Sequence, residues 1–82
     1  MKVKPLRHDL TEYLKKQNIT TKFNKAKKLF EQNLRHPSLN TEILEPHHHG
    51  IYSFRIDRKY RALFFFDGEL VEIFQITNHY RK

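Results

Sequence analysis

The strongest constraint on the fold is the series of strand patterns in the second half of the chain. Residues 51–56, 60–66 and 70–77 each have strand character, and short connections separate them. Asp67-Gly68 is a dipeptide typical of a type I′ hairpin turn. The last segment is apolar on both faces, which is typical of a strand in the middle of a sheet. These residues predict a mainly antiparallel sheet.

The first half of the chain has helical periodicity instead. Apolar residues recur at helical spacing over residues 7–18, and again from Thr20 to about residue 34. Thr20 and Thr21 are typical N-cap residues for the second helix. A short strand is expected over residues 41–44. The predicted fold class is therefore α+β, with two N-terminal helices packed on one face of a small, mainly antiparallel four-stranded sheet.

Length and composition limit the chain to a single domain, residues 1–82. Seven Phe and four Tyr supply the large side chains that a compact core of this size needs. The absence of cysteine excludes a disulfide framework and a thiol nucleophile, which agrees with a cytoplasmic location. No apolar run approaches the roughly 18 residues of a membrane span, so no membrane association is expected. Residues 3–6 are left open as an edge strand because Pro5 restricts pairing.

The charge balance points to a polyanionic partner. Sixteen Lys and Arg residues against nine Asp and Glu residues leave a formal charge of +7. Nucleic acid is the commonest polyanion that a small basic protein meets. Charge alone predicts binding to nucleic acid and says nothing about chemistry.

Strand alternation predicts which polar side chains share a surface. If Phe54 packs under the helices, Arg55 points to the opposite, open face of the sheet. Arg61, at the start of the next strand, reaches the same neighbourhood. Glu42 lies on the preceding strand. His79 and Tyr80 directly follow the last strand, so all five candidate residues are expected to converge on one concave face: Glu42, Arg55, Arg61, His79 and Tyr80.

These residue types suit RNA cleavage without a metal or other cofactor. A general base must take the proton of a ribose 2′-hydroxyl, and an acid must protonate the departing 5′-oxygen. Glu42 and His79 suit these proton transfers. Arg55 and Arg61 suit the charge that grows on the phosphorus, and Tyr80 suits stacking on a base or a hydrogen bond to phosphate. The consecutive histidines 47–49 are not expected to bind a metal, because they cannot all point at one ion.

The sequence from about residue 36 onward resembles the RelE/ParE superfamily of type II toxin–antitoxin toxins, and among them the YoeB-type members. The resemblance rests on the segments TEIL, GIYSFRI and KYRALF and on the final ITNHY. By this resemblance Glu42 corresponds to the proposed general base, and Arg55 and Arg61 correspond to the arginines of two successive strands. His79 and Tyr80 correspond to the family's terminal His-Tyr pair. Two features depart from the pattern: Phe54 replaces a residue that is often basic, and Arg81 and Lys82 extend past that pair.

The resemblance implies a RelE-like fold and the activity of an mRNA interferase. Such an endoribonuclease cleaves translated mRNA in the ribosomal A site and leaves a 2′,3′-cyclic phosphate. Its partners would be a cognate antitoxin protein, mRNA and ribosomal RNA. Four further basic residues are expected to bind RNA: Arg58, Lys59, Arg81 and Lys82.

The residues leave several alternatives open. A ParE-like toxin that inhibits DNA gyrase shares the scaffold and needs neither the glutamate nor the histidine. A module that binds RNA or a protein partner without catalysis is a third hypothesis. Which of Glu42 and His79 is the acid and which the base is also open, as are codon preference, the identity of the antitoxin and the formation of a homodimer.

Overall fold

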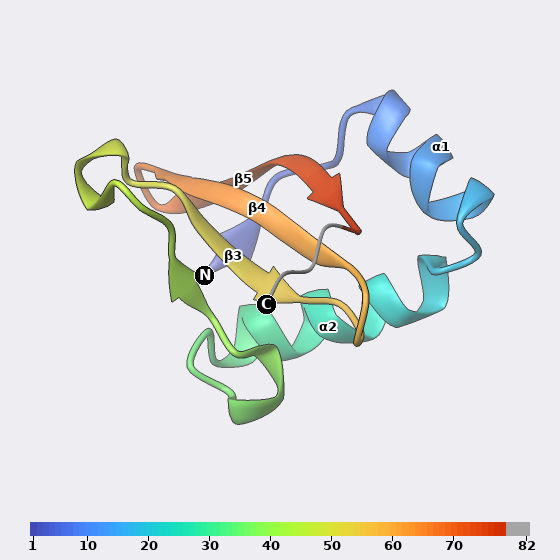
Figure 1. Ribbon diagram of the computed structural model, residues 1–82, viewed down its shortest axis with the longest axis horizontal. Coiled ribbons are helices and arrows are strands. Elements are labelled where there is room, and N and C mark those ends of the chain that lie inside the picture. Colours follow the sequence, from blue (N-terminus) through green and yellow to red (C-terminus); the bar gives the residue numbers. More distant parts are fainter. Residues whose placement is uncertain (79–82) are drawn as a thin grey trace.

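The computed structural model describes residues 1–78, in which two helices cover one face of a sheet (Figure 1). The predicted α+β class is confirmed. Within the described residues, no helix has the length and apolar character needed to cross a membrane. In chain order the elements are β1 (Lys2–Val3), α1 (His8–Lys16), α2 (Thr20–Gln32), the 3-10 turn η1 (Pro37–Leu39), β2 (Glu42–Ile43), the 3-10 turn η2 (His47–His49), β3 (Tyr52–Arg55), β4 (Arg61–Asp67) and β5 (Leu70–Thr77).

The sheet of the described residues has five strands rather than the four expected, in the order β1-β5-β4-β3-β2. The additional strand is β1, which pairs parallel to β5 with Val3 opposite Val71. The backbone N–H of Val3 also donates to the Glu31 carboxylate at 2.8 Å. β1 covers Lys2–Val3 and ends before Pro5, which lacks the N–H that a longer strand would need, rather than running over residues 3–6.

The last strand lies inside the sheet, as its apolar character predicted. β5 pairs with β1 on one side and antiparallel with β4 on the other. Val71, Ile73 and Ile76 are buried towards the helices. On the open side the ring of Phe74 packs against Phe65 with 5.9 Å between centroids. That open face is half-exposed, so only one face of β5 is fully covered in the described residues.

The turn between β4 and β5 begins one residue later than predicted. Asp67 and Leu70 are the closing pair of the ladder, so Gly68 and Glu69 form the two-residue loop. Gly68 has a φ of 65°, whereas Glu69 is not among the residues with positive φ. A positive φ at the first central position alone is the pattern of a type II′ turn, which favours glycine at that position. The expected type I′ turn at Asp67-Gly68 is therefore wrong.

The junction between the helices also differs from the prediction. α1 ends in a Schellman motif, in which Asn18 has a φ of 61° and the Ile19 N–H donates to the Leu14 carbonyl at 2.9 Å. Ile19 is the N-cap of α2 and makes no side-chain cap. Thr20, expected as a cap, is the first helical residue, and its hydroxyl is buried without a partner among the described residues. Burial of the Ile19 side chain, 4% exposed, sets where α2 begins.

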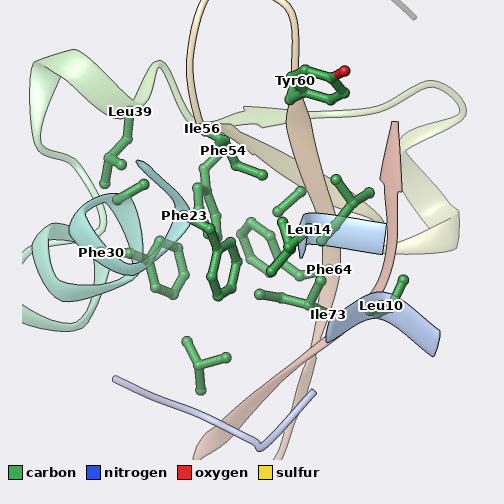
Figure 2. Packing of buried hydrophobic residues seen from close by; sticks show 14 of the residues in the cluster. Leu10, Leu14, Phe23, Phe30, Leu39, Phe54, Ile56, Tyr60, Phe64 and Ile73 are labelled. Carbon is green, nitrogen blue, oxygen red and sulfur yellow. The ribbon is translucent and has the colours of Figure 1, made fainter. Parts of the chain in front are cut away.

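Aromatic side chains form the centre of the core between the helices and the sheet (Figure 2). Phe30 of α2 is fully buried and stacks on Phe54 of β3 with 4.8 Å between ring centroids. Its edge meets Phe64 of β4 at 5.0 Å. Leu14 of α1 and Ile73 of β5 belong to the same cluster. Because all these strand residues point towards the helices, their neighbours in sequence point to the open face.

Candidate functional site

Three of the predicted catalytic residues lie along neighbouring strands of the sheet. Arg55 of β3 is the register partner of Arg61 at the start of β4. Glu42 of β2 is opposite Ser53 of β3, two residues before Arg55. Since Phe54 and Ala62 are fully buried against the helices, Arg55 and Arg61 stand on the other side of their strands. The register thus places these residues close together, as the alternation predicted, while their catalytic roles stay predictions.

The Arg61 guanidinium donates hydrogen bonds to two neighbouring segments. Its Nε donates to the Ser53 hydroxyl at 2.9 Å, and one terminal nitrogen donates to the Asn40 carbonyl at 2.6 Å. The same nitrogen lies 3.4 Å from the Ser53 carbonyl. Ser53 is only 2% exposed, so the Nε–H of Arg61 donates to a buried hydroxyl. A planar guanidinium held in this way is pre-oriented for an anionic ligand.

Asn40 connects Arg61 to Glu42, and the sequence analysis missed it. The residue follows η1 and has a φ of 45°, a left-handed conformation that asparagine tolerates better than most residues. Its carbonyl accepts from Arg61, while its side-chain nitrogen lies 3.4 Å from a carboxylate oxygen of Glu42. Leu39, 1% exposed, anchors the preceding turn in the core. The asparagine after Pro37-Ser38-Leu39 was the signal in the sequence that a left-handed turn residue occurs here.

Glu42 lies at the exposed outer edge of the sheet. β2 is two residues long, and both of its side chains are exposed. No cationic side chain of residues 1–78 lies within salt-bridge distance of Glu42. The Glu42 side chain borders an open hollow of about 420 Å³, which residues of four segments line: Leu34, Arg35, Pro37, Asn40, Thr41, Ile43, Tyr52 and Phe66.

Arg55 is exposed at the end of β3 and is placed differently from Arg61. β2 pairs only with Tyr52 and Ser53 of β3. In the described part of the chain, the end of β3 that carries Arg55 therefore has no strand beside it on that side and lies at the edge of the sheet. Arg55 is among the residues that line a groove against α2, whereas the Ser53 hydroxyl accepts from Arg61. Among the described residues Arg55 makes no ion pair. The two arginines are thus register partners in the sheet but have different surroundings.

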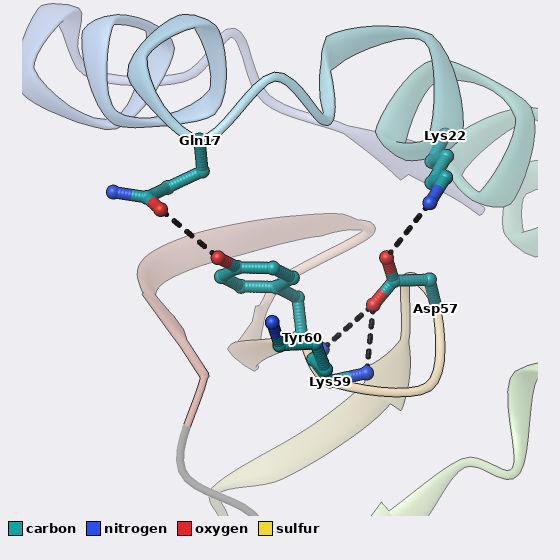
Figure 3. Close-up of polar contacts among 5 residues, drawn as sticks. All are labelled: Gln17, Lys22, Asp57, Lys59 and Tyr60. Atoms are coloured by element: carbon teal, nitrogen blue, oxygen red, sulfur yellow. Dashed lines mark hydrogen bonds and ion pairs between the residues drawn. The ribbon is translucent and has the colours of Figure 1, made fainter.

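The turn between the arginine-bearing strands is tied to both helices (Figure 3). One carboxylate oxygen of Asp57 accepts from the backbone N–H groups of Lys59 and Tyr60 at 2.8 and 2.9 Å. The other oxygen pairs with Lys22 of α2 at 3.3 Å. The Tyr60 hydroxyl donates to the side-chain oxygen of Gln17, just after α1, at 3.0 Å. These contacts fix the turn that sets the spacing of Arg55 and Arg61.

The Asp57 carboxylate has a lowered pKa, and its neighbours explain the direction. Burial by itself raises the pKa, but the two backbone donors and the Lys22 ammonium outweigh it. The ionised form is therefore favoured by folding. Stability from this group is fully present above the unfolded pKa, roughly 4, and is lost as the pH falls through the lower folded value.

We expect Asp57→Asn to lower the free energy of unfolding by about 1 kcal/mol at pH 7, because an amide oxygen accepts weaker hydrogen bonds than a carboxylate. Urea unfolding of both proteins from neutral to acid pH measures the difference. It should shrink once the pH falls below roughly 4. Glu69→Gln, in the exposed turn after β4, is the matched control and should have little effect. A difference between wild type and Asp57→Asn that stays constant over this pH range would contradict the role of the charge.

Arg58 and Lys59, predicted to bind RNA, are exposed at the tip of the β3–β4 turn. The remaining predicted residues, His79, Tyr80, Arg81 and Lys82, lie outside the described residues. β5 ends at Thr77, whose register partner is Arg61. The described chain therefore ends next to the strand position that carries Arg61.

The histidine triplet takes part in local contacts at the surface. Nε2 of His47 lies 2.8 Å from a carboxylate oxygen of Glu45, and the rings of His48 and His49 meet edge-on at 4.6 Å. Within residues 1–78, no group of three or more His, Asp or Glu side chains is arranged to hold a metal ion.

The fold has counterparts among solved structures of bacterial toxins. A "YoeB/ParE toxin" from Agrobacterium tumefaciens superposes with a TM-score of 0.72 at 21% identity, covering 98% of this chain and 100% of that chain. The chain therefore has the fold of YoeB and ParE toxins, and the fold expected from the sequence resemblance is confirmed. At this identity the likeness establishes architecture.

Two structures of YoeB from Staphylococcus aureus have the same architecture. One is the heterotetrameric YoeB–YefM toxin–antitoxin complex, with a TM-score of 0.68. The other is a YoeB dimer, with a TM-score of 0.65. Each is 22% identical to this chain, covering 96% of it and 94% of the solved chain. No protein-family model and no curated protein sequence matches the chain.

Proposed function

We propose that this protein is the toxin of a type II toxin–antitoxin system and acts as a ribosome-dependent endoribonuclease on translated mRNA. The observation that carries the proposal is the Arg61 guanidinium, held by Ser53 and Asn40 beside Glu42 on the face that carries Arg55. The shared fold with YoeB and ParE toxins supports it independently. In this proposal residues 1–82 form one RelE-like toxin domain.

The proposed chemistry is an internal attack within the RNA. A base, Glu42 or His79, removes the proton of the ribose 2′-hydroxyl, and the 2′-oxygen bonds to the adjacent phosphorus. The bond from phosphorus to the 5′-oxygen breaks, and the other member of the pair protonates that oxygen. The products are a 2′,3′-cyclic phosphate and a free 5′-hydroxyl. No oxidation occurs, and the proton removed from the 2′-oxygen is balanced by the proton delivered to the 5′-oxygen.

Arg61 and Arg55 would stabilise the negative charge that builds on the non-bridging oxygens in this reaction. Guanidinium groups fixed before the substrate arrives need little reorganisation, which is where electrostatic catalysis gains most. Tyr80 is assigned to a base or a phosphate oxygen. With arginines in this role, the proposed mechanism needs no metal ion or other cofactor.

The proposed partners follow from the same assignment. An antitoxin would bind and neutralise the toxin, as the YoeB–YefM complex from Staphylococcus aureus illustrates for its own chains. A homodimer is proposed as well, because the YoeB of Staphylococcus aureus has been solved as a dimer. Arg58, Lys59, Arg81 and Lys82 are assigned to mRNA and ribosomal RNA, and the site of action would be the cytoplasm.

Mapping of mRNA 5′ ends after induction of the chain without an antitoxin tests the proposal. New ends bearing a 5′-hydroxyl should appear within translated frames and should disappear when translation initiation is blocked. A DNA-damage response with intact mRNA would favour a ParE-like gyrase inhibitor instead. Normal growth with intact mRNA would favour a binding module without catalysis. Loss of cleavage on chelation, with ribosomes kept intact, would contradict the metal-independent mechanism.

A further inference from the structure

A second hollow, separate from the one beside Glu42, lies where α2, η1 and the end of β3 meet. It is an open groove of about 270 Å³. Lys22 and Lys25 of α2 line it, together with Arg55 and, on its far wall, Ser38. Its volume is just below the range of roughly 300–1,000 Å³ typical of small-molecule pockets. An open groove of this size suits a segment of a longer chain better than an enclosed ligand.

The groove carries three cations against one carboxylate. Lys22 and Lys25 are three residues apart on α2 and so face the same side of the helix. The one carboxylate, Asp57, already accepts hydrogen bonds from Lys22 and from two backbone N–H groups. Within residues 1–78, neither Lys25 nor Arg55 has a carboxylate within salt-bridge distance. Two exposed cations are therefore available to an anion.

The floor of the groove is apolar and buried. Ala26 is 5% exposed, Leu39 is 1% exposed and Ile56 is 8% exposed. Charges that line a cleft with low-dielectric walls concentrate the electric field inside it, which raises the local concentration of counter-ions. The groove therefore attracts an anion more strongly than the same three cations would on a flat surface.

We propose that this groove binds the phosphodiester backbone of single-stranded RNA next to the cleaved bond. The proposal rests on the proposed function and adds a subsite to it. Arg55 is the link, since it lines the groove and is the register partner of Arg61. A strand whose reacting phosphate lies at Arg61 thus continues past Arg55 to Lys25. One residue would then contact the RNA on both sides of β3.

The groove fits RNA better than an acidic protein segment. Protein partners gain most of their affinity from apolar and aromatic anchors at the centre of the interface. Exposed groups of that kind, Ile43 and Phe66, border the hollow beside Glu42 rather than this groove. Here the apolar atoms form a buried floor, and the accessible groups are cationic. Binding of an acidic peptide is therefore one of the outcomes that the test below distinguishes.

The test is a binding measurement that does not depend on cleavage. The probe is a fluorescent uridine oligonucleotide with 2′-O-methyl groups, which lacks the 2′-hydroxyl proton and cannot react. We expect Lys25→Ala to weaken its binding about fivefold at roughly 0.1 M salt, because each phosphate contact to a single strand adds about 0.7 to the salt slope. The magnitude of the slope of log K against log salt should fall by about 0.7.

Lys16→Ala is the matched control, because Lys16 is exposed on α1 and does not line the groove. It should change neither the affinity nor the slope. Equal effects of the two substitutions, or no effect of Lys25→Ala, would overturn the proposal. So would a poly-glutamate peptide that binds in a Lys25-dependent way when the oligonucleotide does not. The probe cannot react, so its binding is measured independently of cleavage. If the protein binds the probe through Lys25 but cleaves no mRNA, the proposed function is contradicted while the assignment of the groove to RNA still holds.

Discussion

Arg61→Ala is expected to reduce translation-dependent mRNA cleavage by about 100-fold or more, the effect typical of removing one preorganised donor from an oxyanion site. The Ser53 hydroxyl and the Asn40 carbonyl, from two different segments, orient this guanidinium. Arg61→Lys keeps the charge but cannot make both contacts with a planar fork, so it should also lose most of the activity. Primer extension on an mRNA translated in a purified system measures the cleavage.

Arg7→Ala is the control for the loss of one positive charge. Arg7 pairs with Asp9 at 2.9 Å on the surface ahead of α1, and 52% of its side chain is exposed. This variant should cleave mRNA as the wild type does. Circular dichroism of each variant shows whether the fold is kept. A folded Arg61→Ala protein with full activity would refute the assignment of this site.

Phe30→Ala is expected to lower the free energy of unfolding by about 3–5 kcal/mol. The ring is fully buried and contacts both Phe54 and Phe64, so its removal loses apolar burial and two aromatic contacts and leaves a cavity. Small domains are stable by only about 5–15 kcal/mol in total, so much of the stability would be lost. Urea unfolding followed by circular dichroism measures the change.

Phe66→Ala removes the same atoms at a position where the side chain is 38% exposed. Its ring lies at the rim of the aromatic cluster, 5.0 Å from Tyr52 and 5.7 Å from Phe64. The loss of stability should be clearly smaller than for Phe30→Ala. Equal urea midpoints for the two variants would show that the Phe30 ring is not the centre of the core.

Local periodicity accounts for most of what the sequence predicted correctly. The alternation around Phe54 placed Arg55 on the opposite face, because side chains of a strand alternate whatever the strand packs against. The helices were predicted within a few residues of their ends because their apolar residues recur at helical spacing. The first strand was left open because its partner, Leu70–Thr77, is remote in sequence and two residues carry no period.

The supporting contacts of the site depended on tertiary packing and could not be read from periodicity. Ser53 looked like an ordinary polar strand residue, but the approach of Arg61 makes it a buried acceptor. Asn40 contacts Arg61 because η1 positions its carbonyl, which no pattern in the strands reveals. Thr20 is a good N-cap by propensity, yet burial of Ile19 moved the start of the helix.

The strand order also bears on how the chain folds while it is being synthesised. β1 pairs with the last strand, and Lys4 just after it bonds Glu72 across a separation of 68 residues. Contacts between such distant segments form late, since a long loop must close first. Because β5 lies between β1 and β4, β1 cannot join the sheet before Leu70–Thr77 has been synthesised. The nascent chain is therefore expected to complete its core, and the face opposite it, only after this last strand is free to pair.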